Sequence, residues 1–278
     1  MREKIIILTD IHNCHINWFG TKTEDRLEKM ISDLEEANRE EKADCLLCLG
    51  DVSLDFWFWD IGGSYLHNPP LSNTDNFMKK YFPRLPQPAY IIPGNHEQYG
   101  REDWKKYTGF DRAYMVKTNN AVFVMLDNFS GNLDPKENSD GTYTETDCDA
   151  IEKALRENPD KIVIPCAHYF DMEKESERFK KLLREESRIP ALFIGHTHYT
   201  EVLDAGDDAG NKPIIQCGNY SYNNNREDPY HSFWGWRELY IEDNGDIYTR
   251  YRCPSQKVGN GDIVNEHIID EYSSVKNK

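Results

Sequence analysis

The chain has 278 residues, of which 38% are hydrophobic and 12% aromatic, a composition that excludes a disordered protein and permits one large domain. Its formal net charge of −16 argues against broad binding to a nucleic-acid backbone, which requires a basic surface. A small phosphorylated substrate is compatible with this charge, because a metal cluster can supply positive charge locally. No apolar run has membrane-spanning length.

The N-terminus and the cysteines indicate a cytoplasmic location. Residues 1–8 form too short an apolar run for a signal peptide, and no small-residue cleavage site follows. The seven cysteines are an odd number and several lie in apolar runs, so we expect reduced, buried thiols. Cys45-x-x-Cys48 fits the period of a strand, and no second cysteine pair has the spacing of a zinc or redox motif.

Hydrophobic periodicity predicts strands that alternate with helices and then give way to hairpins. Strands are expected over 4–9, 43–49, 89–92, 113–116, 121–126, 161–167, 191–194, 201–203, 213–217, 237–241 and 247–252, and helices over 23–41, 74–82, 102–107, 146–157 and 173–188. Thr23 is the expected N-cap of the first helix. Asn119-Asn120 and Asn244-Gly245 are turn signals that predict two hairpins. This order favours an α/β sandwich of mixed sheets, in which ligand sites gather beyond the carboxyl ends of the strands.

Two segments lack a clear pattern. Residues 52–75 form an aromatic-rich stretch, with Phe56 to Tyr65 at its centre, and either a substrate-facing lid or a flap packed on the core would fit. The end of the chain is polar and weakly patterned. We therefore expect one catalytic domain over residues 1–253, followed by a polar tail over 254–278 that is disordered or laid over the surface.

Metal-type ligands follow five of the expected strands. These residues are Asp10 and His12, then Asp51, then Asn95 and His96, then His168, and finally His196 and His198. Five of the nine histidines lie at these strand exits, which packing alone does not explain. Imidazole nitrogens combined with carboxylate and amide oxygens suit Zn, Mn, Fe or Ni. The set exceeds what one ion requires, so two ions that share a bridging carboxylate are expected.

The order of these residues resembles a known signature. Asp10-Ile11-His12, Gly50-Asp51, Gly94-Asn95-His96-Glu97, His168 and Gly195-His196-Thr197-His198 match the series D-x-H, G-D, G-N-H-[DE], H and G-H-x-H. This series resembles the metallophosphoesterase (calcineurin-like phosphoesterase) superfamily over about residues 5–202. The resemblance implies a four-layer α/β/β/α sandwich of two mixed β-sheets, with a dinuclear metal site at the C-terminal ends of the strands. The cofactors would be two divalent or transition metal ions, with Mn, Fe, Zn and Ni as candidates.

The resemblance also implies a role for each residue. Asp10, His12 and His198 would hold the first ion and Asn95, His168 and His196 the second, with Asp51 bridging them. His96 would stand over the leaving group as general acid, while a metal-bridging hydroxide attacks phosphorus in line.

Departures from known branches of the superfamily narrow this interpretation. Leu54 stands where serine/threonine protein phosphatases have the aspartate that orients the catalytic histidine, and Asp55 lies one place further on. The sequence therefore does not identify the residue that orients His96. Purple acid phosphatases differ at the positions of His12 and Leu54, so the iron-binding tyrosine of that branch is absent. The pattern is closer to cyclic-nucleotide phosphodiesterase-like and nuclease members.

The function expected from the sequence is hydrolysis of a small phosphomonoester or phosphodiester, with a nucleotide among the options. A nuclease is the first alternative, which the negative charge disfavours. A non-catalytic metal-binding scaffold is the second, which the retained His96 disfavours. His15 and Tyr169 are candidate substrate-binding residues, although His15 also fits an ordinary loop position, and residues 219–225 are a candidate rim of the pocket. The sequence does not indicate an oligomeric state.

Overall fold

The computed structural model describes residues 2–18, 20–59, 64–65, 72–135, 137–138, 140–223, 233–258 and 261–275. The helices are α1 (Thr23–Glu40), α2 (Asn73–Lys80), α3 (Arg101–Thr108), α4 (Cys148–Glu157) and α5 (Glu177–Glu185), with short 3-10 turns at Phe82–Arg84 and Asp207–Ala209. The strands are β1 (Glu3–Leu8), β2 (Asn17–Trp18), β3 (Thr21–Lys22), β4 (Cys45–Leu49), β5 (Phe58–Trp59), β6 (Ser64–Tyr65), β7 (Ala89–Ile92), β8 (Tyr114–Lys117), β9 (Ala121–Met125), β10 (Ile162–Cys166), β11 (Leu192–Ile194), β12 (Val202–Asp204), β13 (Pro213–Gln216), β14 (Trp236–Ile241), β15 (Ile247–Cys253), β16 (Gln256–Lys257), β17 (Ile263–Val264) and β18 (His267–Ser273).

The fold contains two mixed six-stranded sheets. The first has the order β18-β15-β14-β1-β4-β7, and the second has the order β12-β13-β11-β10-β9-β8. Strands β1, β4 and β7 are parallel, as are β9, β10, β11 and β13, so their carboxyl ends meet at one edge of each sheet. Both expected hairpins are confirmed, because β8 pairs with β9 and β14 with β15 in antiparallel fashion.

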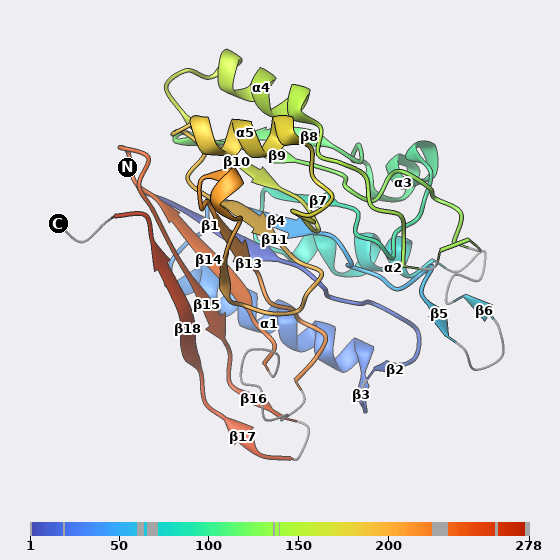
Figure 1. Ribbon diagram of the computed structural model, residues 1–278. Helices are drawn as coiled ribbons and strands as arrows, with labels where there is room; N and C mark the ends of the chain where they lie inside the picture. The colour runs from blue at the N-terminus through green and yellow to red at the C-terminus, as the bar shows by residue number, and fades with distance from the viewer. Residues whose placement is uncertain are drawn as a thin grey trace.

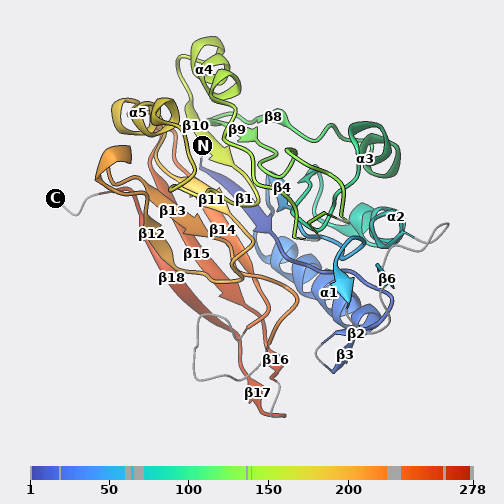
Figure 2. The same ribbon diagram turned by 45° about the vertical axis from the view of Figure 1, so that its right-hand side comes forward.

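Apolar side chains fill three interfaces, one between the two sheets and one between each sheet and its helices. Alternate residues of the strands, such as Ile5 and Leu47 in one sheet and Phe123 in the other, form the core between the sheets. The opposite faces pack on helices: β1 and β4 contact α1, α2 and α3, and β9 to β11 contact α4 and α5. In Figures 1 and 2, α4 and α5 lie on one side of the two sheets and α1 lies on the other. The expected four-layer α/β/β/α sandwich is confirmed.

The end of the chain differs from the expected disordered or surface-laid tail. Strand β18 pairs with β15 and forms the edge of the first sheet. Its side chains are mostly half-buried and do not alternate cleanly between apolar and polar, so the hydrophobic pattern carries little signal. The strand is held by hydrogen bonds to its neighbour, and Arg237 adds one to the backbone oxygen of Asp270.

Two smaller differences concern the helices. Thr23 is the first residue of α1 and not its cap, and its hydroxyl donates to the backbone oxygen of Ile16. Helix α5 begins at Glu177, four residues later than the expected 173, because the Ser176 side chain accepts from the Phe179 amide and caps it there. In the described part of the chain, no helix combines the length and the apolar character needed to cross a membrane.

The aromatic stretch is described only in part, since residues 60–63 and 66–71 lie outside the described residues. Phe56 is half-buried and packs on Tyr99, with ring centroids 4.8 Å apart, in the layer between the first sheet and its helices. Trp57 packs in a small cluster with Cys14, Leu54 and Tyr222. For Phe56, the flap packed on the core is therefore the better description.

Candidate metal centre

The metal-type residues lie together because the strands that precede them end at the same side of the molecule. Strands β1, β4 and β7 lead into Asp10, Asp51 and Asn95, while β10 and β11 of the other sheet lead into His168 and His196. The structure groups the donor atoms of Asp10, His12 and His198 in one set and those of Asp51, His168 and His196 in a second set, each within 4.8 Å.

Asp10 is the centre of the first group. Its Oδ1 lies 3.2 Å from His198 Nε2 and 3.7 Å from His12 Nε2. The other oxygen, Oδ2, accepts from the Thr9 hydroxyl at 2.7 Å and from the His196 amide at 2.9 Å, which fixes the carboxylate. Oδ1 is buried and accepts no hydrogen bond from any described residue. A buried oxygen of this kind that faces two imidazole nitrogens fits a metal ligand.

Asp51 and Asn95 organise the second group. Asn95 Oδ1 lies 2.9 Å from both His168 Nε2 and His196 Nδ1, and Asp51 Oδ2 lies 3.2 Å from His168 Nε2. The same Asp51 oxygen lies 3.7 Å from His12 Nε2 of the first group. Asp51 therefore stands between the two groups, the position that the resemblance implies for a bridging carboxylate.

The backbone at these residues is strained. Among the described residues other than glycine, seven have positive φ, and five of them are Asp10, His12, Asp51, His196 and His198, with φ between 49° and 66°. Left-handed backbone is costly for side chains with a Cβ, and it persists where the surrounding structure imposes it. Its concentration at five expected ligands supports a functional site, and the sequence carries no signal for it.

Two glycines allow the loops to approach each other closely. A Cβ on Gly195 would lie 1.9 Å from Thr9 Oγ1 and 2.7 Å from Asp10 Oδ2. A Cβ on Gly94 would lie 2.2 Å from Asp51 Oδ1. Only glycine fits at either position, which explains the glycines of the G-H-x-H and G-N-H motifs.

Asp10 and Asp51 are held in their charged form. Burial alone would raise the pKa of Asp10, but the charge of His198 and the contact with His12 outweigh it and lower that pKa well below its usual range. Burial opposes ionisation of Asp51 in the same way, and the charges of His168 and His96 lower its pKa. Burial alone would lower the pKa of His12. Asp10 and Asp51 outweigh burial, so the pKa of His12 is raised overall. The site therefore presents anionic oxygens to cations without any change of protonation.

His168 carries a proton that a metal ion must displace. Burial would lower the pKa of His168, but the charge of Asp51 raises it to about 9 in the metal-free protein. Burial, assisted by the charge of His168, lowers the pKa of His196 to about 4, so that ring is neutral and ready to bind. His168 Nδ1 lies 2.7 Å from the Leu49 backbone oxygen, which orients the ring so that Nε2 faces Asp51.

We expect the metal affinity of the His168 group to rise with pH up to about 9, the raised pKa of this ring. Below the raised pKa the ion held by the His168 group displaces one proton from this ring, so its association constant should rise about tenfold per pH unit. The same proton stabilises the metal-free fold fully below pH 6.5, and this contribution is lost as the pH rises through 9. Calorimetric titration with Zn²⁺ across this range measures the affinity, and a flat profile would contradict the assignment.

His96 lies beside both groups without an orienting carboxylate. Its Nε2 lies 3.8 Å from Asp51 Oδ2 and 3.4 Å from Asn95 Nδ2, and its amide donates to Asp51 Oδ1 at 3.0 Å. Its Nδ1 is buried and has no hydrogen-bond partner in the described part of the chain. Asp55 instead accepts from the Asn73 amide at 2.7 Å and the Thr74 amide at 2.9 Å, at the start of α2. Burial lowers the pKa of His96.

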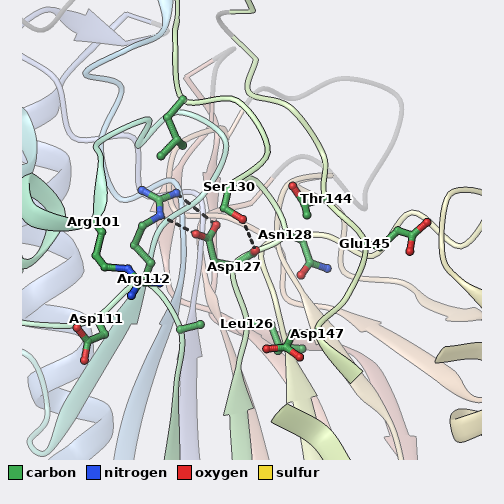
Figure 3. A pocket seen from close by; sticks show the side chains of 12 residues that line it. Arg101, Asp111, Arg112, Leu126, Asp127, Asn128, Ser130, Thr144, Glu145 and Asp147 are labelled. Atoms are coloured by element: carbon green, nitrogen blue, oxygen red, sulfur yellow. Dashed lines mark hydrogen bonds and ion pairs between the residues drawn. The ribbon is translucent and has the colours of Figure 1, made fainter. Parts of the chain in front are cut away.

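Glu97 and Arg112 hold the loop that carries His96, and the sequence pattern missed both roles. The buried Glu97 carboxylate accepts from the amides of Asp51, Ser53 and Gly94 at 2.7–2.9 Å, which ties the loops after β4 and β7 together. Arg112 Nη1 donates to the Glu97 backbone oxygen at 3.2 Å, and its Nε donates to Asp127 Oδ2 at 2.6 Å. Figure 3 shows Arg112 directed at Asp127 on the wall of a cavity of about 600 Å³.

A buried cation supports the loop after β1. Arg26 of α1 is fully buried, and its Nη2 donates to the His12 backbone oxygen at 3.0 Å. Its Nη1 donates to the backbone oxygens of Ile11 and Tyr220. Arg26 therefore joins the first ligand loop to residues 219–222. Helical spacing predicts the apolar face of α1 but gives no signal that this arginine is buried.

Three aromatic rings line the centre. Tyr169 packs on His196 with ring centroids 4.9 Å apart, Tyr222 packs on His198 at 4.5 Å, and Phe129 lies 5.8 Å from the His168 ring. Tyr169 and the segment of Tyr222 were expected near the site, whereas Phe129 was not. His15 is exposed, and no contact in the described residues joins it to the centre.

A two-layered sheet core flanked by helices, with histidines and carboxylates at the shared strand edge, defines the class of dinuclear metallohydrolases. The family model of the calcineurin-like phosphoesterases matches residues 3–200, so the chain belongs to this family of metallophosphoesterases. Its members act with two divalent metal ions, and the two residue groups described above provide the corresponding sites. Among curated proteins, none matches the chain in sequence.

Solved structures with a similar fold include a purple acid phosphatase, PPD1, from seeds of yellow lupin (Lupinus luteus), with a TM-score of 0.55 and 14% identity. The similarity covers 97% of this chain but only 54% of the lupin protein, so the chain spans about half of that length. GAP50, described as the anchor in the inner membrane complex of Plasmodium, has a TM-score of 0.52 and 14% identity, with 97% of this chain and 89% of that one covered. At such identity these similarities show the fold alone.

Proposed function

We propose that this protein hydrolyses a small phosphomonoester or phosphodiester and that it requires two divalent or transition metal ions to do so. The observation that carries the proposal is the arrangement around Asp51. This carboxylate lies between the two ligand groups. Its Oδ2 is 3.2 Å from His168 Nε2, 3.7 Å from His12 Nε2 and 3.8 Å from Nε2 of the buried His96.

The residues of the chain divide the work as follows. Asp10, His12 and His198 would hold one ion and Asn95, His168 and His196 would hold the other, with the Asp51 carboxylate available to both. When bound, the ions lower the pKa of water and neutralise charge on the phosphoryl group. His96 would give a proton to the departing oxygen from Nε2, the ring nitrogen that faces the centre, while Nδ1 is buried. Phe129, Tyr169 and Tyr222 limit the access of water.

Three further properties are part of this proposal. The seven cysteines are all free and buried, which supports a reducing, cytoplasmic environment. The catalytic domain spans residues 1–253, and β18 of the following segment completes its first sheet. Manganese is the metal to test first, because oxygen and imidazole ligands occur together in both groups.

A nuclease and a non-catalytic scaffold are the alternatives within the same fold. The net charge of −16 opposes the backbone contacts that a nuclease needs. A non-catalytic scaffold needs no acid residue, whereas here His96 lies beside both ligand groups. These observations favour the phosphoesterase.

The test is a panel of phosphoesters with protein reconstituted separately with Mn²⁺, Fe²⁺, Zn²⁺ or Ni²⁺. We expect release of p-nitrophenol from p-nitrophenyl phosphate or bis-p-nitrophenyl phosphate, and loss of this activity after chelation. Cyclic and linear nucleotides form the second part of the panel. The proposal fails if no ester is cleaved with any of the four ions while the protein is folded and metal-loaded. Binding of a DNA duplex at physiological salt would favour the nuclease instead.

A further inference from the structure

The three ligands of the first group share a feature of their backbone. Asp10, His12 and His198 all have positive φ, between 51° and 63°, and the backbone oxygen of each accepts a hydrogen bond from another segment of the chain. Left-handed backbone at such residues persists where the surrounding structure imposes it, so these hydrogen bonds indicate what imposes it here. The donors lie on α1 and at residues 219–220, shortly after β13.

Helix α1 and Tyr220 hold the two ligands that follow β1. Arg26 Nη2 donates to the His12 backbone oxygen at 3.0 Å, and the Tyr220 amide donates to the Asp10 backbone oxygen at 3.2 Å. The Tyr220 backbone oxygen in turn accepts from Arg26 Nη1. Because one guanidinium bonds to both segments, it fixes the position of residues 219–222 relative to the ligand loop.

Asn219 connects the same segment to the third ligand. Asn219 is 1% exposed, and its Nδ2 donates to the His198 backbone oxygen at 3.2 Å. Its Oδ1 accepts from the Ser221 and Tyr222 amides at 2.9 Å and 2.6 Å, which fixes the turn that carries the Tyr222 ring. That ring packs on His12 and His198, with ring centroids 5.6 Å and 4.5 Å apart. Asn219 therefore holds both a ligand and the ring beside it.

The second group has a different support. In the described part of the chain, Arg26, Asn219 and Tyr220 form no hydrogen bond to a ligand of that group. Its loops are held instead by the Glu97 carboxylate, which accepts from the amides of Asp51 and Gly94. The two groups therefore contact each other directly but rest on separate sets of hydrogen bonds.

We infer that Arg26 and Asn219 are the positioning residues of the first metal group, and that they set the affinity of its ion without changing the affinity of the second group. The inference rests on the two-metal centre of the function proposed above. Neither side chain belongs to a ligand group, so each acts through the backbone of a ligand. Loss of a partner that orients a ligand typically lowers metal affinity about 10–100-fold.

Two single-group backgrounds test the inference. His168→Ala disables the second group, and His198→Ala disables the first. Arg26→Lys keeps the charge but lacks the fork that bonds to two segments. We expect it to weaken Zn²⁺ binding about 10–100-fold in the His168→Ala background and to leave it unchanged in the His198→Ala background. Calorimetric titration measures both affinities, and Asn219→Ala, which removes the donor to His198, should give the same pattern.

Arg188→Lys and Asn158→Ala are the matched controls. Arg188 Nη1 donates to three backbone oxygens at the end of α4 at 3.1–3.3 Å, and Asn158 Nδ2 donates to the Ala154 backbone oxygen at 2.7 Å. Their acceptors lie on the helix side of the second sheet and belong to neither ligand group. Both variants should lower Tm and leave the Zn²⁺ affinity unchanged in each background.

A wild-type protein that binds no Zn²⁺ would overturn the two-metal centre, and with it the proposed function. If the wild-type protein binds two ions, the positioning role fails when Arg26→Lys and Asn219→Ala keep the full affinity of the first group, or when they weaken both groups equally. The proposed function stands in either case. Asn219→Ala alone decides the inference if Arg26→Lys does not fold.

Discussion

Replacing Asp51 with asparagine is expected to lower kcat/KM at least about 10³-fold and to reduce the metal content to one ion or fewer per chain. Asp51 is 1% exposed, and its Oδ2 lies within 3.2–3.8 Å of His168, His12 and His96. Asparagine keeps the shape but removes the charge that both ligand groups share. Metal analysis after dialysis and steady-state kinetics on an aryl phosphate measure the two effects.

Asp55→Asn is the control for the Asp51 substitution. Asp55 is also a fully buried carboxylate, but it accepts from the backbone of Asn73 and Thr74 at the start of α2. Its replacement should destabilise the protein and leave the metal content at the wild-type value. The rise in Tm on addition of metal provides a readout that is independent of activity, and it should be largely absent in Asp51→Asn. An Asp51→Asn protein with full metal content and full activity would refute the bridging role.

Replacing His96 with asparagine is expected to lower kcat about 10²–10⁴-fold for an alkyl phosphate ester, with both ions retained. His96 Nε2 faces the centre, but the ring belongs to neither ligand group. A departing alkoxide is a strong base and needs a proton, whereas p-nitrophenolate leaves easily without one. The loss should therefore be much smaller for p-nitrophenyl esters than for alkyl esters, and rates measured across leaving groups test this dependence.

His267→Asn is the matched control for His96. His267 lies on β18, where its Nδ1 is 2.9 Å from the backbone oxygen of Asn265, and it has no role in the centre. That variant should retain full activity on every ester. A His96→Asn protein whose loss is the same for good and poor leaving groups would indicate that the ring positions other groups and does not act as an acid.

The sequence was sufficient to place the elements that end at the centre, because those signals are local. Each strand before a ligand is a short apolar run, and each run ends in a glycine or a polar residue such as Asp10 or His168. Parallel strands bring their carboxyl ends together, so convergence followed from the fold class. The individual roles of the ligands and of His96 stay predictions until the substitutions above are measured.

The features that the sequence did not indicate depend on contacts between distant segments. Glu97 binds three amides that only the folded loops bring together, and Arg112 reaches it from beyond α3. Asn219 was expected only at the rim of the pocket, whereas the fold places its Nδ2 against the backbone oxygen of His198. Strand β18 was missed because its place in the sheet depends on pairing with β15. The hydrophobic pattern of β18 itself does not indicate a strand.

The left-handed backbone at the ligands sets a trade-off between stability and function. Each such residue costs about 1–3 kcal/mol, and the two sheets and their buried anchors sustain this cost. Replacing Asp10 or His198 with glycine would relieve the backbone strain at that position but would remove a donor atom. Backbone that fixes the donor atoms leaves an ion little reorganisation to drive, so more of its binding energy is retained as affinity. The centre therefore gives up local backbone stability in exchange for a fixed set of donor atoms.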